Sequence, residues 1–398
     1  ENNPSTTTTT TKTKEEETLE VWKPTKGVAF IYNPAANKGK SKEFFEKNKE
    51  RIQAIYQPVP THILETQKQG GGYDCALEAV THYKCDLVVA CGGDGTVNEV
   101  LNGIVDPKTK KPRAAMAIIG LGTGNDFRRT LGFADNDLEA YITALNDGYC
   151  KNLDFGELQS THIVNIEEGE EDYLNAEEEE KQDEEEEEEK EESQKDDKKE
   201  EQKQKPKKRA IQKRRFFMNE CTYGLGGAVM QAINSQKAHP FGKTASFIFH
   251  SLYQQVTFEN KPAVMHFDDM DPVQMVQKMA SVCNGRYFGN NMIAAPRGRP
   301  DSGTFQVCCV GDVGVIESIP ILKNFYKGTH VQHPKVHTME CKRFQASPLY
   351  PKDHLYIEMD GELFGQLPCE AVKHERALKM VVPKDFESHQ PQPLYHDS

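Results

Sequence analysis

The stretch Gly92-Gly93-Asp94-Gly95-Thr96-Val97-Asn98-Glu99-Val100 decides the fold, because it joins two kinds of periodic sequence. Before it, Leu87–Ala90 is a short apolar run typical of a buried strand. After it, apolar residues recur at helical spacing as far as Ile104. Glycines between a strand and a helix start let the main chain approach a ligand, and the helix offers free N–H groups. The stretch therefore predicts a cradle for phosphate groups.

Asp94 makes this turn more than a phosphate cradle. A carboxylate beside phosphates repels them unless it binds a metal ion or its water shell, or accepts a proton from an attacking hydroxyl. A second turn, Gly122-Thr123-Gly124-Asn125-Asp126, follows the strand expected at 114–119. Neighbouring parallel strands end at one edge of a sheet, so the two turns can face one ligand. A lone turn favours a tight structural connection, whereas the pair favours a phosphate and metal site.

The first half of the chain alternates strands and helices. Strands are expected at 28–32 and 62–64, and helices at 41–56 and around 73–80 and 138–145, the last ending at Gly148. This alternation is typical of a parallel sheet. From about Phe216 the runs become short and partly alternating, which predicts an antiparallel sandwich or barrel-like second domain.

The net charge of −13 is concentrated in one segment between the two halves. Residues 167–201 hold 22 acidic and 5 basic residues, and 203–215 add eight basic and no acidic residues. Such blocks bury too little apolar area to offset chain entropy, so 167–215 is expected to be a disordered insert or a solvated helix. A dispersed acidic surface is excluded.

Three further features limit the class of protein. The ten cysteines include no C-x-x-C pair and are interpreted as reduced, mostly buried thiols of an intracellular protein. No apolar run approaches the roughly 18 residues of a membrane span. We expect a cytoplasmic protein with peripheral membrane association; organellar targeting stays open because the chain begins with Glu1.

Together these motifs carry a family resemblance. The two turns, with Asn33-Pro34 before them, resemble the diacylglycerol kinase catalytic domain, a family that includes bacterial lipid kinases, sphingosine and ceramide kinases and acylglycerol kinase. Asn284–Gly289, Ala295-Pro296 and Asp360-Gly361-Glu362 resemble motifs of its second domain. The resemblance implies an N-terminal three-layer α/β domain with a mostly parallel sheet, a C-terminal antiparallel β-sandwich, and an ATP site in the cleft between them.

The resemblance also implies roles for individual residues. Transfer of the ATP γ-phosphoryl group to a lipid hydroxyl would use Glu362 as general base, with Asp94 as the rival for that role. The residues that would contact ATP are Asn33, Pro34, Thr66, Gly92, Gly93, Asp94, Gly95, Thr96, Val97, Asn98, Gly122, Thr123 and Asn125. Asp94, Asp126 and Asp154 would organise Mg²⁺ and its water.

The chain departs from the family pattern at two places. Ala36 and Asn37 stand where the family usually has a small hydroxyl and a glycine, which puts nucleotide contacts there in doubt. Ser302 stands where members often carry the Asp of a structural metal site, and Asp301 could replace it only in part.

The predicted organisation has five parts. These are a disordered tail at 1–24, the catalytic α/β domain at 25–157, the β-sandwich at 158–166 and 216–383, the disordered insert at 167–215, and a tail at 384–398. The expected partners are ATP and a lipid at a membrane surface, without nucleic acid. Diacylglycerol is the first choice of lipid, with sphingosine, ceramide or monoacylglycerol as alternatives.

Two other functions are compatible with the residues. An NAD kinase shares the Gly-Gly-Asp-Gly-Thr turn, although the second turn and the second-domain motifs favour the lipid branch. A non-catalytic scaffold would use the charged insert, whose basic end, 203–215, could also touch anionic lipid. Phosphorylation of NAD alone, or partner capture without ATP turnover, would identify these alternatives.

Overall fold

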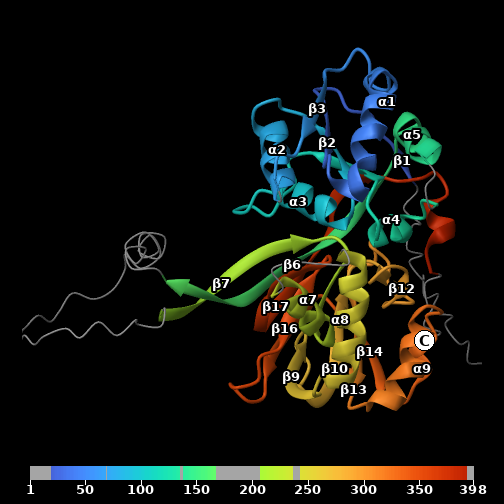
Figure 1. The fold of residues 1–398 in the computed structure, drawn as a ribbon. Helices are drawn as coiled ribbons and strands as arrows, with labels where there is room; N and C mark the ends of the chain where they lie inside the picture. The colour runs from blue at the N-terminus through green and yellow to red at the C-terminus, as the bar shows by residue number, and fades with distance from the viewer. Residues whose placement is uncertain (1–18, 69, 135–137, 167–206, 236–242, 392–398) are drawn as a thin grey trace, which may run out of the picture. The chain divides into compact units, whose positions relative to one another are not determined.

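The computed structural model describes residues 19–68, 70–134, 138–166, 207–235 and 243–391, which form two compact units (Figure 1). The first unit comprises Glu1–Phe155, Arg299–Ser302 and Glu375–Ser398, and the second comprises Gly156–Gly298 and Gly303–His374. The chain therefore leaves the first unit, builds the second, and returns twice.

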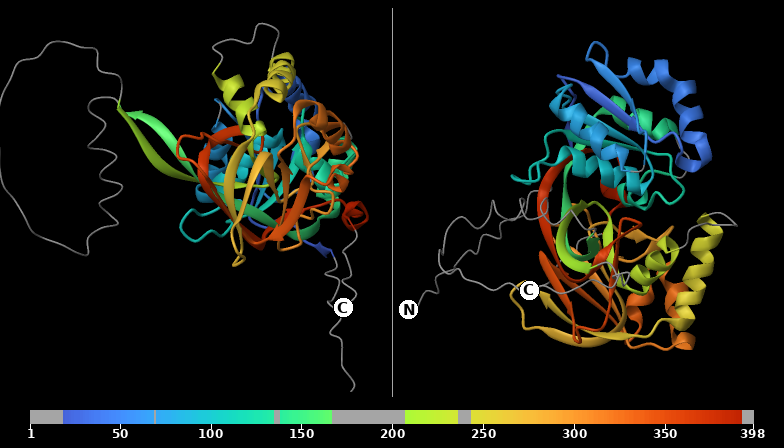
Figure 2. Two further views of the ribbon diagram at one scale, coloured as in Figure 1. Left: turned by 90° about the horizontal axis from the view of Figure 1, so that it is seen from below. Right: turned by 60° about the vertical axis from the view of Figure 1, so that its left-hand side comes forward.

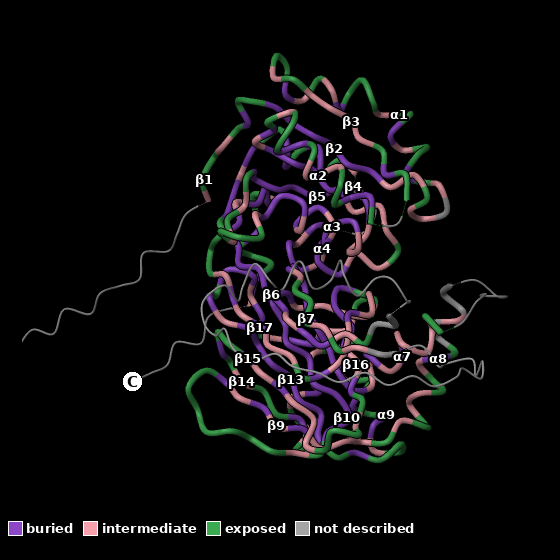
Figure 3. The backbone as a smooth tube through the Cα atoms, turned by 90° about the vertical axis from the view of Figure 1, so that its left-hand side faces the viewer, coloured by how far each residue is buried: buried purple, intermediate pink, exposed green. Residues whose placement is uncertain are grey.

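The first unit contains the predicted parallel sheet. Its strands are β2 (Val28–Tyr32), β3 (Thr61–Glu65), β4 (Leu87–Gly92) and β5 (Ala115–Gly120), in the order β5-β4-β2-β3. Strands β2 and β4 are buried along their whole length, as Figure 3 shows in purple. Such continuous burial is typical of parallel sheets covered on both faces, and it explains the unbroken apolar runs of the sequence.

Helices cover both faces of this sheet, so the unit has three layers. The helices are α1 (Lys40–Ala54), α2 (Gly71–Thr81), α3 (Asp94–Ile104), α4 (Asp126–Leu131) and α5 (Leu138–Asp147), with a short 3₁₀ turn, η1 (Ala36–Gly39), before α1. Helices α2 and α3 pack together, and the ion pair Arg51–Glu139 joins α1 to α5. Figures 1 and 2 show these two helix pairs on opposite sides of the strands. Gly148 has a φ of 73° and ends α5, as predicted.

The second unit is built mainly of antiparallel strands. They are β8 (Glu220–Gly224), β9 (Lys261–Phe267), β10 (Val273–Cys283), β13 (Phe305–Gly311), β14 (Val336–Cys341), β15 (Arg343–Pro348), β16 (Tyr356–Met359) and β17 (Glu362–Val381), with a small pair β11 (Tyr287–Phe288) and β12 (Met292–Ile293). Strand β17 belongs to this unit as far as His374, and its remainder belongs to the first unit. Pairing runs β10-β8-β16-β17-β15-β9 and returns to β10, so the strands enclose a core. Phe217, Phe305 and Phe344 are fully buried in it.

Helices of the second unit are an addition to the prediction, which expected strands alone in this half. They are α7 (Leu225–Asn234), α8 (Lys243–Thr257) and α9 (Val315–Phe325), with a 3₁₀ turn, η2 (His330–Gln332). The Gly224 turn that precedes α7 has a φ of 88° and no room for a side chain, because an added Cβ would lie 2.6 Å from the Lys278 carbonyl oxygen. Close packing of the main chain therefore explains the glycine at this position.

The predicted disordered insert is wrong for residues 207–215. They belong to strand β7 (Lys207–Phe217), which pairs antiparallel with β6 (Tyr149–Ile166) from Gly156↔Phe217 to Ile166↔Lys207. Pairing satisfies the backbone groups, and ion pairs of Arg214 with Glu157 and of Arg215 with Glu362 balance part of the positive charge. The rest of the predicted insert, 167–206, lies outside the described residues.

The predicted bounds of both tails are wrong, because the end of the first tail and the start of the second are ordered parts of the fold. Strand β1 (Glu20–Val21) pairs with the start of β6, although it falls within the predicted tail 1–24. At the other end β17 pairs in parallel with β5 through Met380↔Met116, and the 3₁₀ turn η3 (Phe386–His389) follows. Phe386 is fully buried, so burial of an aromatic side chain fixes this part of the predicted tail 384–398.

Two findings concern cysteines and membrane spans. All ten cysteines are free, and eight of them are buried. Within the described parts of the chain, no helix is both long enough and apolar enough to cross a bilayer.

A buried carboxyl group in the second unit makes stability depend on pH. Burial raises the pKa of Glu220 well above its ordinary 4.5, and the neighbouring carboxylates Glu358 and Asp360 raise it further. Thr222 hydrogen-bonds to the Glu220 carboxyl group. Because the folded state favours the protonated form, the contribution of Glu220 to the free energy of unfolding is fully present below about pH 4.5 and is lost as the pH rises through its raised pKa.

The variant Glu220→Gln should lose less stability than wild type between pH 5 and pH 8, because its neutral amide needs no proton. Urea unfolding at both pH values measures the difference, with exposed Glu259→Gln as control. Equal losses in wild type and Glu220→Gln would show that Glu220 does not titrate in this range.

Candidate functional site

The two predicted turns touch each other in the first unit, after β4 and β5. The main-chain N–H groups of Leu121 and Gly122 donate to the Gly92 carbonyl oxygen, at 2.8 and 3.1 Å. A Cβ added to Gly122 would lie 2.4 Å from the Cα of Gly93, so no larger residue fits without movement of the main chain. Close approach of the two main chains is therefore the reason for a glycine at position 122.

Asp94 ties the first turn to the second. It is the first residue of α3, and its carboxylate accepts hydrogen bonds from the main-chain N–H groups of Asp126 and Phe127, each at 3.1 Å. These two donors belong to the first turn of α4, where a negative charge is favourable. Each carboxylate oxygen of Asp94 therefore accepts one main-chain N–H group of the second turn.

Asn125 and Asp126 shape the second turn. Asn125 is left-handed at φ 53°, and its side chain exchanges two hydrogen bonds with the main chain of Gly122, at 3.0 and 2.8 Å. The buried Asp126 carboxylate pairs with Arg129 at 2.9 Å, and Arg129 also donates to the Gly124 carbonyl oxygen. Arg129 is a part of the site that the sequence reasoning missed, although its i, i+3 spacing from Asp126 was visible.

The remaining predicted nucleotide contacts follow the same edge of the sheet. Asn33 comes directly after β2, and its side-chain oxygen accepts the Ala35 N–H at 2.9 Å. Thr66 comes directly after β3 and is buried, with its N–H donating to the Tyr32 carbonyl oxygen at 3.0 Å. The others lie at the same carboxyl ends of the strands: Pro34 after β2, Gly95, Thr96, Val97 and Asn98 in the first turns of α3, and the exposed Thr123 after β5.

Glu99 is a second residue that the sequence reasoning did not single out. It lies on α3, and its two carboxylate oxygens accept the main-chain N–H groups of Gly70 and Gly72 at 2.9 and 2.8 Å. A carboxylate at this place satisfies free donors at the start of α2. Glu99 therefore holds α2 against α3 and so supports the edge that carries the turns.

Asp154 lies apart from the two turns in its hydrogen bonding. It is a fully buried residue of β6, and its carboxylate accepts the Arg376 N–H at 2.7 Å. Its own N–H donates to the Pro300 carbonyl oxygen at 2.6 Å. These contacts tie it to β17 and to the 299–302 segment, and its role with a metal ion stays a prediction.

Glu362 belongs to the second unit, as the first residue of β17. The preceding turn is fixed by Asp360, whose carboxylate accepts the main-chain N–H groups of Met218, Asn219 and Glu220, each at 3.0 Å. The Glu362 carboxylate pairs with Arg215 at 2.9 Å, and its side chain is 32% exposed. The turn is therefore rigid, while the carboxylate at its end can still be reached by solvent.

The donor set at the glycine turns fits a magnesium ion bound together with phosphates. Among the described residues, no group of three or more His, Cys, Asp or Glu side chains forms a complete metal site. Mg²⁺ in nucleotide sites is usually held by one or two carboxylates plus substrate phosphates and water. Asp94 and Asp126 are two carboxylates and so match that requirement. They are too few to hold a metal ion with protein ligands alone.

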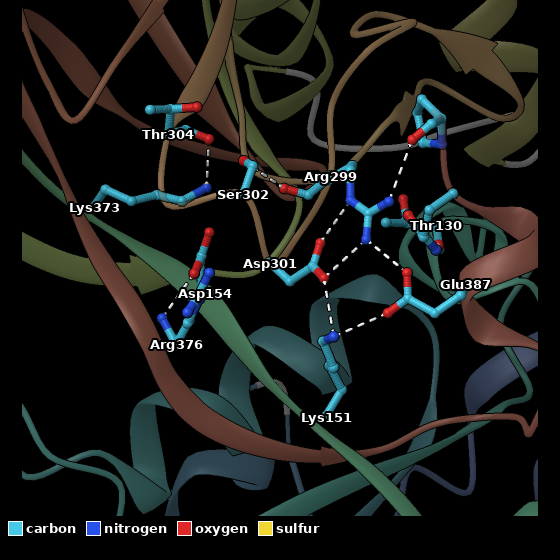
Figure 4. Close-up of polar contacts among 12 residues, drawn as sticks. Thr130, Lys151, Asp154, Arg299, Asp301, Ser302, Thr304, Lys373, Arg376 and Glu387 are labelled. Atoms are coloured by element: carbon cyan, nitrogen blue, oxygen red, sulfur yellow. Dashed lines mark hydrogen bonds and ion pairs between the residues drawn. The ribbon is translucent and has the colours of Figure 1, made fainter. Parts of the chain in front are cut away.

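The 299–302 segment contains an ion-pair network (Figure 4). The two carboxylate oxygens of Asp301 accept hydrogen bonds from the Arg299 guanidinium, at 2.9 and 3.0 Å. The Lys151 ammonium nitrogen lies 3.6 Å from the same carboxylate. Glu387 contacts the same two cations at 2.8 and 2.9 Å. Two cations balance two carboxylates, so these residues do not fit a divalent metal ion. That Ser302 removes a structural metal site stays a prediction.

Comparison with known proteins agrees with this arrangement. Residues 27–158 match the family model described as the diacylglycerol kinase catalytic domain, and 220–385 match the YegS C-terminal NAD kinase beta sandwich-like domain. Diacylglycerol kinases of Staphylococcus aureus and Staphylococcus saprophyticus are 23% and 22% identical, covering 91% of this chain and 94% and 97% of their own lengths. A crystal structure of a diacylglycerol kinase from Bacillus anthracis covers 91% of this chain and 98% of its own, with a TM-score of 0.57 and 19% identity.

The fold and the paired turns define a two-domain kinase, with an α/β catalytic domain and a β-sandwich domain. The chain belongs to the diacylglycerol kinase family, and it is a lipid kinase.

Proposed function

We propose that this protein transfers the γ-phosphoryl group of ATP to the free hydroxyl of diacylglycerol, in a reaction that requires Mg²⁺. The observation that carries the proposal is the pair of glycine turns held together by Asp94. Diacylglycerol is the first choice of acceptor because the relatives that match over nine tenths of this chain bear that name. Sphingosine, ceramide and monoacylglycerol are the competing acceptors.

The phosphates of ATP would bind where the main chain is most open to them. The first turn of α3 offers N–H groups and the positive end of the helix dipole, and Gly92 and Gly93 add no side chain that would block the approach. Asn33, Thr66 and Thr123, which follow three other strands, would contact the rest of the nucleotide. Mg²⁺ would neutralise the phosphate charge, with Asp94 and Asp126 as its protein ligands or as acceptors for its water.

The acceptor hydroxyl loses a proton during transfer. A carboxylate within reach can take that proton, and we assign the role to Glu362, at the end of a turn held by three main-chain hydrogen bonds. Rigid placement matters because phosphoryl transfer depends mainly on positioning and on charge stabilisation. Asp94 is the alternative base.

A panel of acceptors tests the proposal. Purified protein is incubated with ATP labelled on the γ-phosphate, Mg²⁺, and in turn diacylglycerol, monoacylglycerol, sphingosine, ceramide and NAD. The strongest labelling is expected for diacylglycerol, and omission of Mg²⁺ should abolish it. Strongest labelling of another lipid would identify that lipid as the substrate instead of diacylglycerol. Labelling of NAD alone would favour an NAD kinase, and no labelling would favour a scaffold.

A further inference from the structure

Helix α8 of the second unit presents an apolar face to solvent. Phe249, Leu252, Tyr253 and Val256 are all more than half exposed. Their spacing of i, i+3, i+4 and i+7 places them on one side of the helix. His250 is buried and α8 packs against α7, so the helix is not exposed all round. The side of α8 that faces solvent is therefore apolar, whereas the solvent side of an ordinary surface helix is polar.

Helix α9 repeats this pattern in the same unit. Ile316 is 86% exposed and Ile319 is 60% exposed, and Leu322 continues the stripe. The inward stripe is Ser318, Ile321 and Phe325, which are buried. Two neighbouring helices that both turn large apolar side chains outward are unusual on a protein that meets only water.

The two apolar stripes lie on adjoining helices. The Gln255 side chain of α8 donates to the Ser318 hydroxyl of α9, and Asn260, just after α8, bonds to Asp312 and to the Val313 carbonyl oxygen just before α9. Figure 3 and the right view of Figure 2 show both helices at the same edge of the second unit. We call this surface the α8–α9 face and define it by Phe249, Leu252, Val256, Ile316, Ile319 and Leu322.

The charges on the two helices suit an anionic partner, whereas the exposed acidic residues Glu259 and Asp312 lie outside them, after α8 and before α9. Residues 246–257 of α8 contain no acidic residue, and the single acidic residue of α9, Glu317, is paired with Lys335 at 2.7 Å. Lys323 and Lys327 are exposed at the end of α9, and Tyr253 and Tyr326 are exposed beside the apolar side chains. Apolar residues flanked by lysines and tyrosines are typical of surfaces that enter the headgroup region of anionic membranes.

We propose that the α8–α9 face docks this kinase on the surface of a phospholipid bilayer that contains anionic lipid. The proposal rests on the proposed function, because an enzyme that phosphorylates a membrane lipid must meet its substrate at that surface. Apolar side chains would enter the boundary between headgroups and acyl chains, while Lys323 and Lys327 would meet the anionic headgroups.

The triple variant Leu252→Ser, Ile316→Ser, Ile319→Ser tests the face. Its sites are exposed, so folding should be unaffected. Cosedimentation with phosphatidylcholine vesicles, with and without phosphatidylserine, should show at least about tenfold weaker binding than wild type, because each buried aliphatic side chain contributes roughly 1.5–3 kcal/mol. A matched control, Met270→Ser, Val273→Ser, Val276→Ser, removes exposed apolar residues of the same unit outside the face and should bind like wild type.

Activity on two substrate forms separates docking from catalysis. The triple variant should phosphorylate a water-soluble short-chain diacylglycerol at the wild-type rate, and should show a raised apparent KM for diacylglycerol in vesicles. Unchanged vesicle binding by the triple variant would overturn the docking proposal, as would a concentration-dependent dimer that only the triple variant loses, which would make the face an interface between copies. Inactivity of wild type on the soluble substrate would instead contradict the proposed function.

Discussion

Asp94→Asn should lower the rate of lipid phosphorylation by about a thousandfold at saturating ATP, the scale of loss expected when a charge-stabilising or proton-accepting group is removed. The structure adds a specific reason. Both carboxylate oxygens accept main-chain N–H groups at the start of α4. Asn has one oxygen that can accept one of these two bonds, and its amide nitrogen cannot accept the other. The substitution therefore removes the negative charge and loosens the link between the two turns.

The loosened link should also be visible in stability. Loss of one hydrogen bond to a charged group predicts a decrease of about 1.5–3 kcal/mol in the free energy of unfolding, measured by urea unfolding. Asp147→Asn, at an exposed position on α5 of the same unit, is the matched control and should change neither quantity. Activity of Asp94→Asn within about threefold of wild type would refute the assigned role.

Glu362→Gln should lower kcat by about a hundredfold to ten-thousandfold, with little change in the KM for ATP, because a general base acts on the acceptor hydroxyl. Initial rates at varied ATP and lipid concentrations separate the two parameters. The loss should be smaller at high pH if hydroxide can replace the missing base. If kcat stays unchanged while Asp94→Asn is inactive, Asp94 becomes the base.

The chain offers a close control for this variant. Glu370 also lies on β17, is 30% exposed against 32% for Glu362, and is likewise paired with an arginine, Arg343. Glu370→Gln therefore repeats the loss of charge and of an ion pair on the same strand. It should keep wild-type activity, so that a defect in Glu362→Gln alone reports on chemistry instead of strand stability.

The meeting of the two glycine turns was predictable because its signals are local. Gly92 and Gly122 each sit between a strand and a helix start, and the rule that parallel strands end at one edge brought them together. What Asp94 bonds to was not predictable, because its two partners lie 32 and 33 residues away along the chain. Glu99 was missed for the same reason, since its partners Gly70 and Gly72 belong to another helix.

The parts of the fold that escaped prediction depend on contacts distant in sequence. Residues 207–215 are basic enough to resemble a solvated tract, yet β6 pairs with them as a strand. The return of 299–302 and 375–391 to the first unit depends on contacts such as Lys151 with Asp301 and Glu387. Helix α9 was missed because its sequence contains Pro320 and its apolar side chains point to both solvent and core.

The most direct test of the central claim is the stoichiometry of phosphoryl transfer by wild-type protein in vesicles containing diacylglycerol. Phosphorus NMR follows the loss of the ATP γ-phosphate and the appearance of lipid phosphate in one sample. We predict one molecule of phosphatidic acid for each ADP formed, with no free phosphate. ADP formed together with free phosphate and no lipid phosphate would contradict the claim that this protein is a lipid kinase with diacylglycerol as its acceptor.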